Sequence, residues 1–307
     1  MTKLTSLGPL TERFRSQKPL RASSLVITVY GDSIEPHGGT VWLGALIKLL
    51  EPMGINERLM RTTIFRLTQE GWLMSDRVGR RSYYSLTGSG RRRFEQAFRR
   101  VYSEHDQPWD GSWCLVLTNR LDSEQRKQLL GDLTWQGFAT LSGQILGSPN
   151  CNTSQVHSIL AAAGVEDDVV VFETRPQEEL AGRPVRLLTK ECWDLQTLGR
   201  QYEEFLNHFR PLWQEVSELT DLRPQECFLA RTLLIHEYRK LVLRDPLLPD
   251  ELLPGDWEGR AARQLCRNIY RALTPAAEQW LEESLETAEG PLPVAANGFY
   301  KRFGGLK

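Results

Sequence analysis

The chain has 307 residues but only five cysteines, none of them in C-x-x-C spacing. Their odd number and scattered positions argue against a disulfide framework and against a cysteine zinc site. We therefore expect reduced, mostly structural thiols at Cys114, Cys151, Cys192, Cys227 and Cys266. No apolar run reaches the roughly 18 residues that a membrane span needs, and the N-terminal segment lacks a secretory apolar core. These absences predict a cytoplasmic protein.

Complete catalytic motifs are also missing. Gly31-Asp32-Ser33 resembles the nucleophile block of the GDS(L) lipases and esterases, but none of the five histidines has the Asp of a D-x-x-H partner three positions before it. A serine without a base within reach is a poor nucleophile. His236-Glu237 begins like a metal-binding H-E-x-x-H helix, yet Lys240 occupies the place of the second histidine. We therefore expect no enzyme, no metal site and no cofactor.

Lysine is absent from residues 56–100, which carry eleven arginines and four acidic residues, a net charge of +7. Because the whole chain has a net charge of −1, the remaining residues sum to −8. Such a basic segment on an acidic body suits a polyphosphate, and arginine can fork to a phosphate or to the acceptor edge of guanine. The simpler alternative is a solvated basic helix face.

The order of elements within residues 42–90 distinguishes a nucleic-acid-binding segment from a merely solvated basic face. Apolar residues at helical spacing predict a helix over 42–54, and Asn56 is placed to cap a second helix over 56–70. Two strand-like segments follow, over 72–76 and 81–86, with Arg77 and Arg80 at the turn between them. Helix, turn, arginine-bearing helix and two-stranded ribbon are typical of a winged helix-turn-helix. We therefore predict DNA binding.

We expect the second helix to enter the major groove and the ribbon to touch the adjacent minor groove or backbone. A dimer would then read a roughly palindromic operator. The alternative for Arg66 is an ion pair with Glu70 one helical turn later. The candidate DNA-binding residues are Arg58, Arg61, Thr62, Arg66, Arg77, Arg80 and Arg81.

The predicted fold class is α+β and multidomain. Residues 1–20 are expected to be a flexible leader, and residues 21–103 the winged helix-turn-helix domain with a linking helix at its end. Within that domain, SSLVITVY has the β-branched content of a strand, but its context favours a helix. Residues 104–176 read as β-α-β-β-α-β, the ferredoxin-like order, and are expected to dimerise. Residues 177–307 are expected to be helical, with a partly ordered tail beyond about residue 290.

Long stretches of the chain resemble the PaaX-type transcriptional repressors of bacterial phenylacetate catabolism. They are YGDSIEPHGG and the following VWLGALIKLLEPMGINERLMRTTIFRLTQEGWL, the ribbon sequence VGRRSYYSLTGSG, PWDGSW, and LRDPLLPDELLPGDW. The resemblance runs from about Ser24 to Gly305. It implies a homodimeric repressor that binds an operator and is released by phenylacetyl-coenzyme A, with an effector site in the helical C-terminal domain.

An acyl-coenzyme A needs cations for its phosphates and an apolar slot for its phenyl end. The alternative for the arginine row, Arg260, Arg263, Arg267 and Arg271, is a solvated helix face. The alternative for His236 is a hydrogen-bonded interior residue. The candidate effector-binding residues are His236, Tyr238, Arg239, Arg244, Trp257, Arg263 and Arg267.

A competing hypothesis is a protein without a small-molecule effector, whose basic helix binds RNA or an acidic partner. The narrow major groove of A-form RNA, which a helix cannot read, disfavours it.

Overall fold

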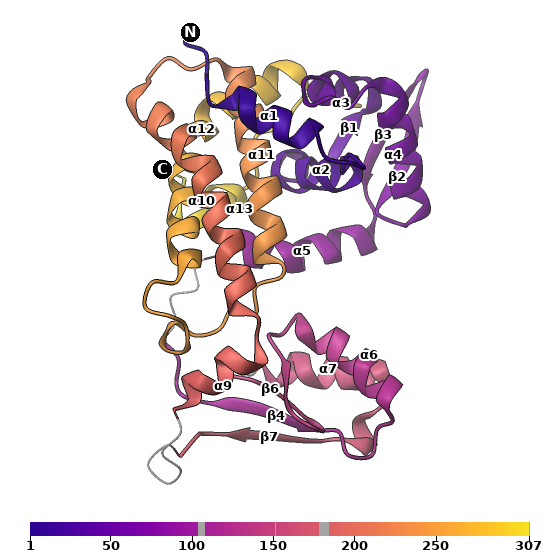
Figure 1. The fold of residues 1–307 in the computed structure, drawn as a ribbon. Helices are drawn as coiled ribbons and strands as arrows, with labels where there is room; N and C mark the ends of the chain where they lie inside the picture. Colours follow the sequence, from indigo (N-terminus) through magenta and orange to yellow (C-terminus); the bar gives the residue numbers. More distant parts are fainter. Residues whose placement is uncertain (104–107, 151, 178–183, 307) are drawn as a thin grey trace. The chain divides into compact units, whose positions relative to one another are not determined.

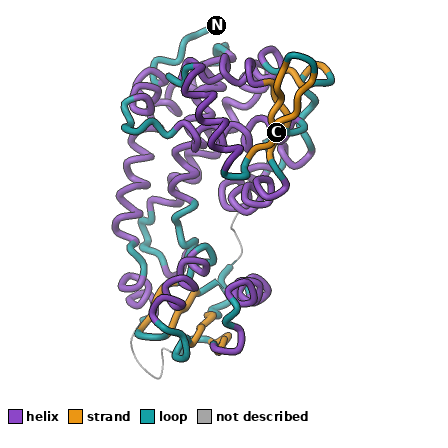
Figure 2. Tube along the Cα trace, turned by 90° about the vertical axis from the view of Figure 1, so that its right-hand side faces the viewer, coloured by secondary structure: helices purple, strands orange, loops and turns teal. Residues whose placement is uncertain are grey.

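The computed structural model describes residues 1–103, 108–150, 152–177 and 184–306. The chain is a mixture of helix and small sheets (Figures 1 and 2). Its contacts divide it into two compact units that do not follow the order of the sequence. Unit 1 comprises Met1–Glu104, Glu203–Lys240 and Arg260–Lys307, and unit 2 comprises His105–Tyr202 and Leu241–Gly259. The C-terminal helical residues 177–307 thus contribute to both units.

The N-terminal part of unit 1 holds five helices and a three-stranded antiparallel sheet. The sheet has the order β1-β3-β2, so the N-terminal strand pairs beside the ribbon. The helices are α1 (Leu7–Arg15), α2 (Ala22–Val29), α3 (Leu43–Leu50), α4 (Glu57–Gln69) and α5 (Gly88–Tyr102), and the strands are β1 (Thr40–Trp42), β2 (Leu73–Val78) and β3 (Arg81–Leu86). Trp42, expected to begin a helix, ends β1 instead, because residues 40–42 complete the sheet edge beside β3.

The expectation of a flexible leader is wrong for residues 4–15. Leu7, Leu10 and Phe14 recur at helical spacing on α1, and all three are buried. The Phe14 ring packs edge-on against the His236 ring, with centroids 5.4 Å apart. The carboxylate of Glu215 accepts backbone hydrogen bonds from Thr5 and Ser6 at 2.7 and 2.9 Å. An apolar stripe of only one side chain per turn therefore suffices to dock the leader.

The segment SSLVITVY is helical, as its context predicted, despite its β-branched residues. Leu25, Val26 and Val29 are completely buried in α2. Tertiary burial thus outweighs the weak intrinsic preference of valine and isoleucine for strands.

Unit 2 contains a four-stranded antiparallel sheet in the order β5-β6-β4-β7, with α6 and α7 packed on it. Strand, helix, strand, strand, helix and strand follow one another along the chain. They are β4 (Trp113–Leu117), α6 (Ser123–Thr134), β5 (Ala139–Ser142), β6 (Ile145–Ser148), α7 (Thr153–Ala163) and β7 (Val170–Thr174). Asp122 caps α6 with a complete capping box, and Val116, Leu133 and Leu160 share the core of the unit.

The remaining helices vary in length, and none in the described ranges is both long and apolar enough to cross a bilayer. They are α9 (Val185–Cys192), α10 (Leu195–Glu218), α11 (Pro224–Val242) and α12 (Glu258–Ser284), followed by the short β8 (Glu286–Thr287), β9 (Gly290–Pro291) and α13 (Asn297–Tyr300). The expectation of a partly ordered tail is wrong for its aromatic end, because Phe299, Arg302 and Phe303 are each 2% exposed.

The cysteines of the described residues are free thiols. Cys114, Cys227 and Cys266 are buried, and Cys192 is partly buried. Cys151 lies outside the described residues.

Candidate nucleic-acid interface

Helix α4 is amphipathic, and its polar face is turned outward. The Asn56 side chain caps it by accepting a hydrogen bond from the backbone N–H of Leu59 at 2.9 Å. Met60, Ile64 and Leu67 bury the opposite face. The four candidate DNA-binding residues of this helix, Arg58, Arg61, Thr62 and Arg66, are all exposed.

The arginines of α4 are held loosely by neighbours on the protein surface. Arg61 Nε donates to Glu57 at 2.9 Å, and Arg66 Nε lies 3.8 Å from a Glu70 oxygen, so the ion pair considered from the sequence is present. Arg66 also donates to the Ser23 hydroxyl. Exposed pairs of this kind contribute only about 0.3–0.5 kcal/mol each, so a phosphate or a base edge can compete for these guanidinium groups.

The ribbon formed by β2 and β3 turns tightly at its tip. Val78 pairs with Arg81, and Gly79 between them has φ +61°, a left-handed conformation that glycine adopts without strain. Arg77 and Arg80 are exposed. Arg81 is half exposed, with its guanidinium 4.4 Å from the Trp42 ring centroid and ion-paired with Glu286. The contacts of Arg81 distinguish it from the other two and were not foreseen.

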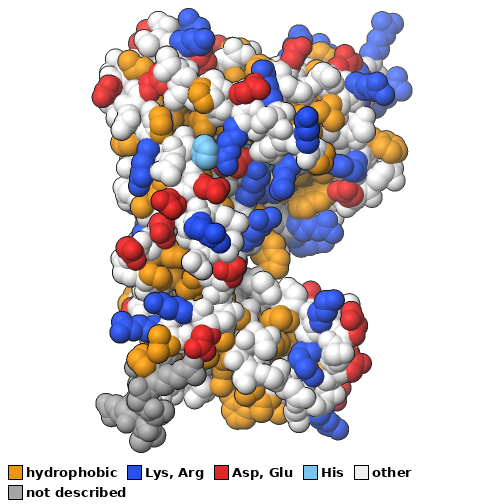
Figure 3. All heavy atoms as spheres, in the orientation of Figure 1, with side chains coloured by type: hydrophobic (Ala, Val, Ile, Leu, Met, Phe, Trp, Pro, Cys, Tyr) orange, Lys and Arg blue, Asp and Glu red, His pale blue; other side chains and the backbone are white. Residues whose placement is uncertain are grey.

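Arginine and lysine side chains crowd the surface of this part of unit 1 in Figure 3, where α4, α5 and the ribbon lie in Figure 1. On α5, Arg91 Nε donates to Glu35 at 2.5 Å and the Arg93 guanidinium lies 5.2 Å from the centroid of the Trp72 ring. The charge excess of residues 56–100 is therefore displayed on one connected segment of the fold.

Of the five candidate effector residues in unit 1, His236 and Tyr238 are buried and the three arginines are partly buried. His236 is 1% exposed, and its Nδ1 lies 3.3 Å from the Thr28 hydroxyl. Burial, assisted by Lys240 and Arg239, holds the pKa of His236 well below its ordinary value. Arg239 donates to the same Thr28 hydroxyl at 3.0 Å. Tyr238 is 2% exposed beside Phe205.

The arginine row of α12 is neither a bare solvated face nor an open cluster. Arg263 and Arg267 are partly buried, and they donate to the Ser103 carbonyl and to Gln264 respectively. The other two candidates belong to unit 2, where Arg244 is exposed and the buried Trp257 ring packs against Tyr202. The seven candidate effector residues are thus divided between the two units.

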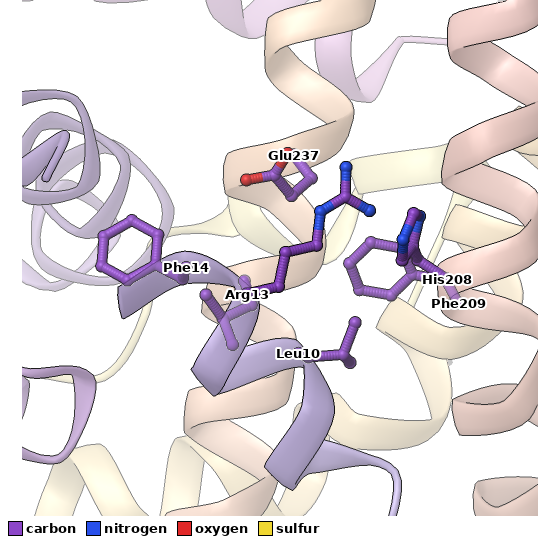
Figure 4. A pocket seen from close by; sticks show the side chains of 7 residues that line it. Leu10, Arg13, Phe14, His208, Phe209 and Glu237 are labelled. Atoms are coloured by element: carbon purple, nitrogen blue, oxygen red, sulfur yellow. The ribbon is translucent and has the colours of Figure 1, made fainter. Parts of the chain in front are cut away.

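A small hollow of unit 1 lies elsewhere. Residues of α1, α10 and α11 line it, and in Figure 4 the Arg13 side chain extends between His208 and Glu237, with Leu10, Phe14 and Phe209 around them. None of the seven candidate effector residues is among its described lining residues.

Sequence reasoning missed a buried charged cluster in unit 1, which we call the polar core cluster: Asp32, His37, Tyr102, Arg231, Tyr270, Glu278 and Arg302. Oδ1 of Asp32 accepts hydrogen bonds from the hydroxyls of Tyr102 at 2.6 Å and Tyr270 at 2.9 Å. Arg302 donates to the same oxygen at 3.1 Å, and Arg231 Nε lies 3.4 Å from the other oxygen. Four segments distant in sequence therefore meet at one carboxylate.

The cluster balances its own charge with two carboxylates and two guanidinium groups. Arg231 donates to Glu278 at 2.7 Å, and His37 Nε2 lies 2.9 Å from the other Glu278 oxygen. Burial alone would raise the pKa of Glu278, but Arg231 and His37 lower it to about 2. The buried charges of the polar core cluster are therefore paired with one another.

The GDS motif, through its Asp32, is part of the polar core cluster. Ser33 is fully buried, and its hydroxyl lies 3.5 Å from the Asp32 carboxylate and 3.4 Å from Arg231. A serine in these surroundings is not presented to a substrate. Within the described residues, no three His, Cys, Asp or Glu side chains are arranged to hold a metal ion.

Known proteins match almost the whole chain. The model of the PaaX-like protein family matches residues 21–90, that of the PaaX protein central Cas2-like domain residues 106–184, and that of the PaaX-like protein C-terminal domain residues 193–283. The transcriptional repressor PaaX of Escherichia coli (strain K12) is 43% identical over 289 residues, covering 94% of this chain and 92% of that protein. An uncharacterized protein from Mycobacterium tuberculosis, with a TM-score of 0.49 and 22% identity over 77% of this chain and 90% of its own, is too distant to bear on function. The chain belongs to the PaaX family.

Proposed function

We propose that this protein is a cytoplasmic transcriptional repressor of phenylacetate degradation genes, with no catalytic activity of its own. In this proposal residues 21–103 form a winged helix-turn-helix domain that places α4 in the major groove and the ribbon tip against the adjacent backbone or minor groove. The bases are read by Arg61, Thr62 and Arg66 with Arg58, while Arg77, Arg80 and Arg81 contact the sugar–phosphate backbone or the minor groove.

The observation that carries the proposal is the outward face of α4 beside an arginine-tipped ribbon. A capped helix with its apolar side buried is rigid, and its exposed side presents guanidinium and hydroxyl groups suited to base edges. The high identity to a named transcriptional repressor gives independent support.

A homodimer is part of the proposal, and the ferredoxin-like domain of residues 104–176 would form it. In support, β7 is the edge strand of its sheet and is exposed along its whole length. Val170, Val171 and Phe172 are 50, 39 and 47% exposed. An uncovered apolar edge strand is a ready template for pairing with another strand. Two such domains would hold two α4 helices for a palindromic operator.

The effector in this proposal is phenylacetyl-coenzyme A, and residues 177–307 contribute its site. The candidate residues of α11 and α12 belong to unit 1, the unit that also carries the DNA-binding segment. A ligand that changes how these helices pack would act on the same packed body as α4. Release of DNA requires the thioester to bind one conformation better than the other.

The test is fluorescence anisotropy on a labelled promoter fragment of phenylacetate genes, with scrambled DNA of equal length as the control. Phenylacetyl-coenzyme A is then titrated into the specific complex, with free phenylacetate and free coenzyme A as separate controls. Sequence-dependent binding that only the thioester reverses supports the whole proposal.

Other outcomes discard parts of it. Specific binding that ignores the thioester retains the DNA-binding function and removes the effector. Equal binding to the promoter fragment, scrambled DNA and RNA removes the repressor, and leaves a general nucleic-acid-binding or interaction protein.

A further inference from the structure

The outward face of α4 contains a large apolar side chain among its polar ones. Phe65 is 66% exposed, and only Met1 and Val294 are more exposed among the large hydrophobic side chains of the described residues. A single exposed apolar side chain is common on protein surfaces, so the position of Phe65 on α4 and its neighbours decide what it can contact.

Its position on α4 is central to the proposed DNA-reading face. Phe65 follows Arg61 and Thr62 by four and three residues, so the three side chains lie next to one another on the helix surface. Gln69, also exposed, follows one turn later. The buried residues Ile64 and Leu67 lie on the other side, so the Phe65 ring does not belong to the core of unit 1.

The neighbouring side chains restrict what can cover this ring. Arg61 and Arg66 flank it with two positive charges, which suit a nucleic acid better than an apolar protein surface. Within the major groove, the one apolar group on a base edge is the C5-methyl of thymine, and phenylalanine is among the side chains that contact it.

We propose that Phe65 is a specificity-determining residue that contacts the methyl group of a thymine in the operator. This inference rests on the proposed function and adds to it one position of defined base preference. Arg61, Thr62 and Gln69 supply polar contacts to neighbouring base edges, while Phe65 selects thymine through shape and desolvation.

The experiment removes only the methyl group. Each thymine of a specifically bound duplex is replaced in turn by deoxyuridine, and the Kd is measured by anisotropy for the wild type and for Phe65→Ala. Val294→Ala, which shortens an 80% exposed side chain outside the DNA-binding segment, is the matched control variant. Thermal unfolding confirms that each variant is folded.

At one thymine in each half-site, the wild type and Val294→Ala should lose about fourfold in affinity on removal of the methyl group. Phe65→Ala should bind both duplexes equally at that position, while Phe65→Leu should keep part of the difference. Deoxyuridine effects that are identical in the wild type and Phe65→Ala at every position, or absent from the wild type, overturn this inference and leave the repressor intact. Wild-type protein that binds scrambled DNA as tightly as the promoter fragment overturns the proposed function, and this inference with it.

Discussion

Asp32 connects several distant segments in the interior of unit 1. Its side chain is 1% exposed. Its carboxylate accepts hydrogen bonds from tyrosine hydroxyls of α5 and α12 and forms ion pairs with arginines of α11 and of the C-terminal end. A buried ion pair adds little compared with an apolar replacement, but removing one partner leaves the other charges without compensation.

We therefore expect Asp32→Ala to lower the free energy of unfolding by about 3–5 kcal/mol, because Arg231 would keep its pair with Glu278 but Arg302 would stay buried without the carboxylate that it pairs with. Urea unfolding followed by circular dichroism measures the change. Glu282→Gln, an exposed position on α12, is the control and should shift stability by less than about 0.5 kcal/mol. Equal stability of the two variants would contradict the role given to Asp32.

Glu278 makes part of the stability dependent on pH. Because its folded pKa is depressed to about 2 from 4.5, its stabilisation is fully present above about pH 5 and is lost as the pH falls toward 2. We expect Glu278→Gln to be less stable than the wild type by about 3 kcal/mol at pH 7, with the difference shrinking below pH 5. Urea unfolding between pH 3 and 7 tests this, and a difference that stays constant with pH would refute it.

At the scale of elements, α4 and the ribbon should contribute to binding in different ways. Arg61→Ala on α4 should reduce the preference for the promoter fragment over scrambled DNA. Arg80→Ala at the ribbon tip should weaken both about equally and reduce the slope of log K against log salt by about 1. Arg120→Ala, an exposed arginine of unit 2, is the control. Anisotropy at several salt concentrations distinguishes these patterns.

The prediction for dimer formation concerns strand β7. A charge at the centre of an apolar edge should prevent its pairing with a second copy, so Phe172→Glu should convert the proposed dimer into a monomer. Trp135→Glu places the same charge on another exposed apolar residue of unit 2 and should leave the dimer intact. Sedimentation velocity measures the mass, and a dimeric Phe172→Glu protein would exclude this edge as the interface.

Elements whose signals are local could be predicted from the sequence. The cap at Asn56, the turn of the ribbon and the strand–helix order of unit 2 each depend on a few neighbouring residues. The predictions of a flexible leader and a partly ordered tail were wrong because both segments dock on partners over 200 residues away. Ser6 donates to Glu215, and Arg302 near the C-terminal aromatic residues donates to Asp32.

The same distinction between local and long-range signals applies to the candidate site residues. Periodicity placed the candidate residues of α4 on its outer face, and the turn signal placed the ribbon arginines at or beside its tip. These residues are exposed. The effector candidates were chosen by chemical type, and several are interior or engaged with other residues, as His236 is with Thr28 and Arg263 is with Ser103. Periodicity specifies which face a residue occupies, whereas only the tertiary fold determines which distant residues meet.

At the scale of the whole molecule, unit 1 is made from three separate stretches of the chain. A fragment of residues 1–104 would lack the helices that supply Arg231, Tyr270 and Arg302. We expect this fragment to melt without a cooperative transition and to bind a dye for exposed apolar surface, whereas the full chain unfolds cooperatively. A fragment with a sharp thermal transition would show that the N-terminal segment folds alone.

The polar core cluster around Asp32 also restricts how the DNA preference of proteins with this architecture can change in evolution. Exchanging residues 1–104 for those of a distant relative would pair one protein's Asp32 segment with another protein's Arg231 and Arg302, and a mismatch there would be buried. New operator preferences are therefore expected to arise by single replacements on the outer face of α4, one base contact at a time. For the same reason, hybrid biosensors should be built by rewriting this helix in place rather than by transplanting a module.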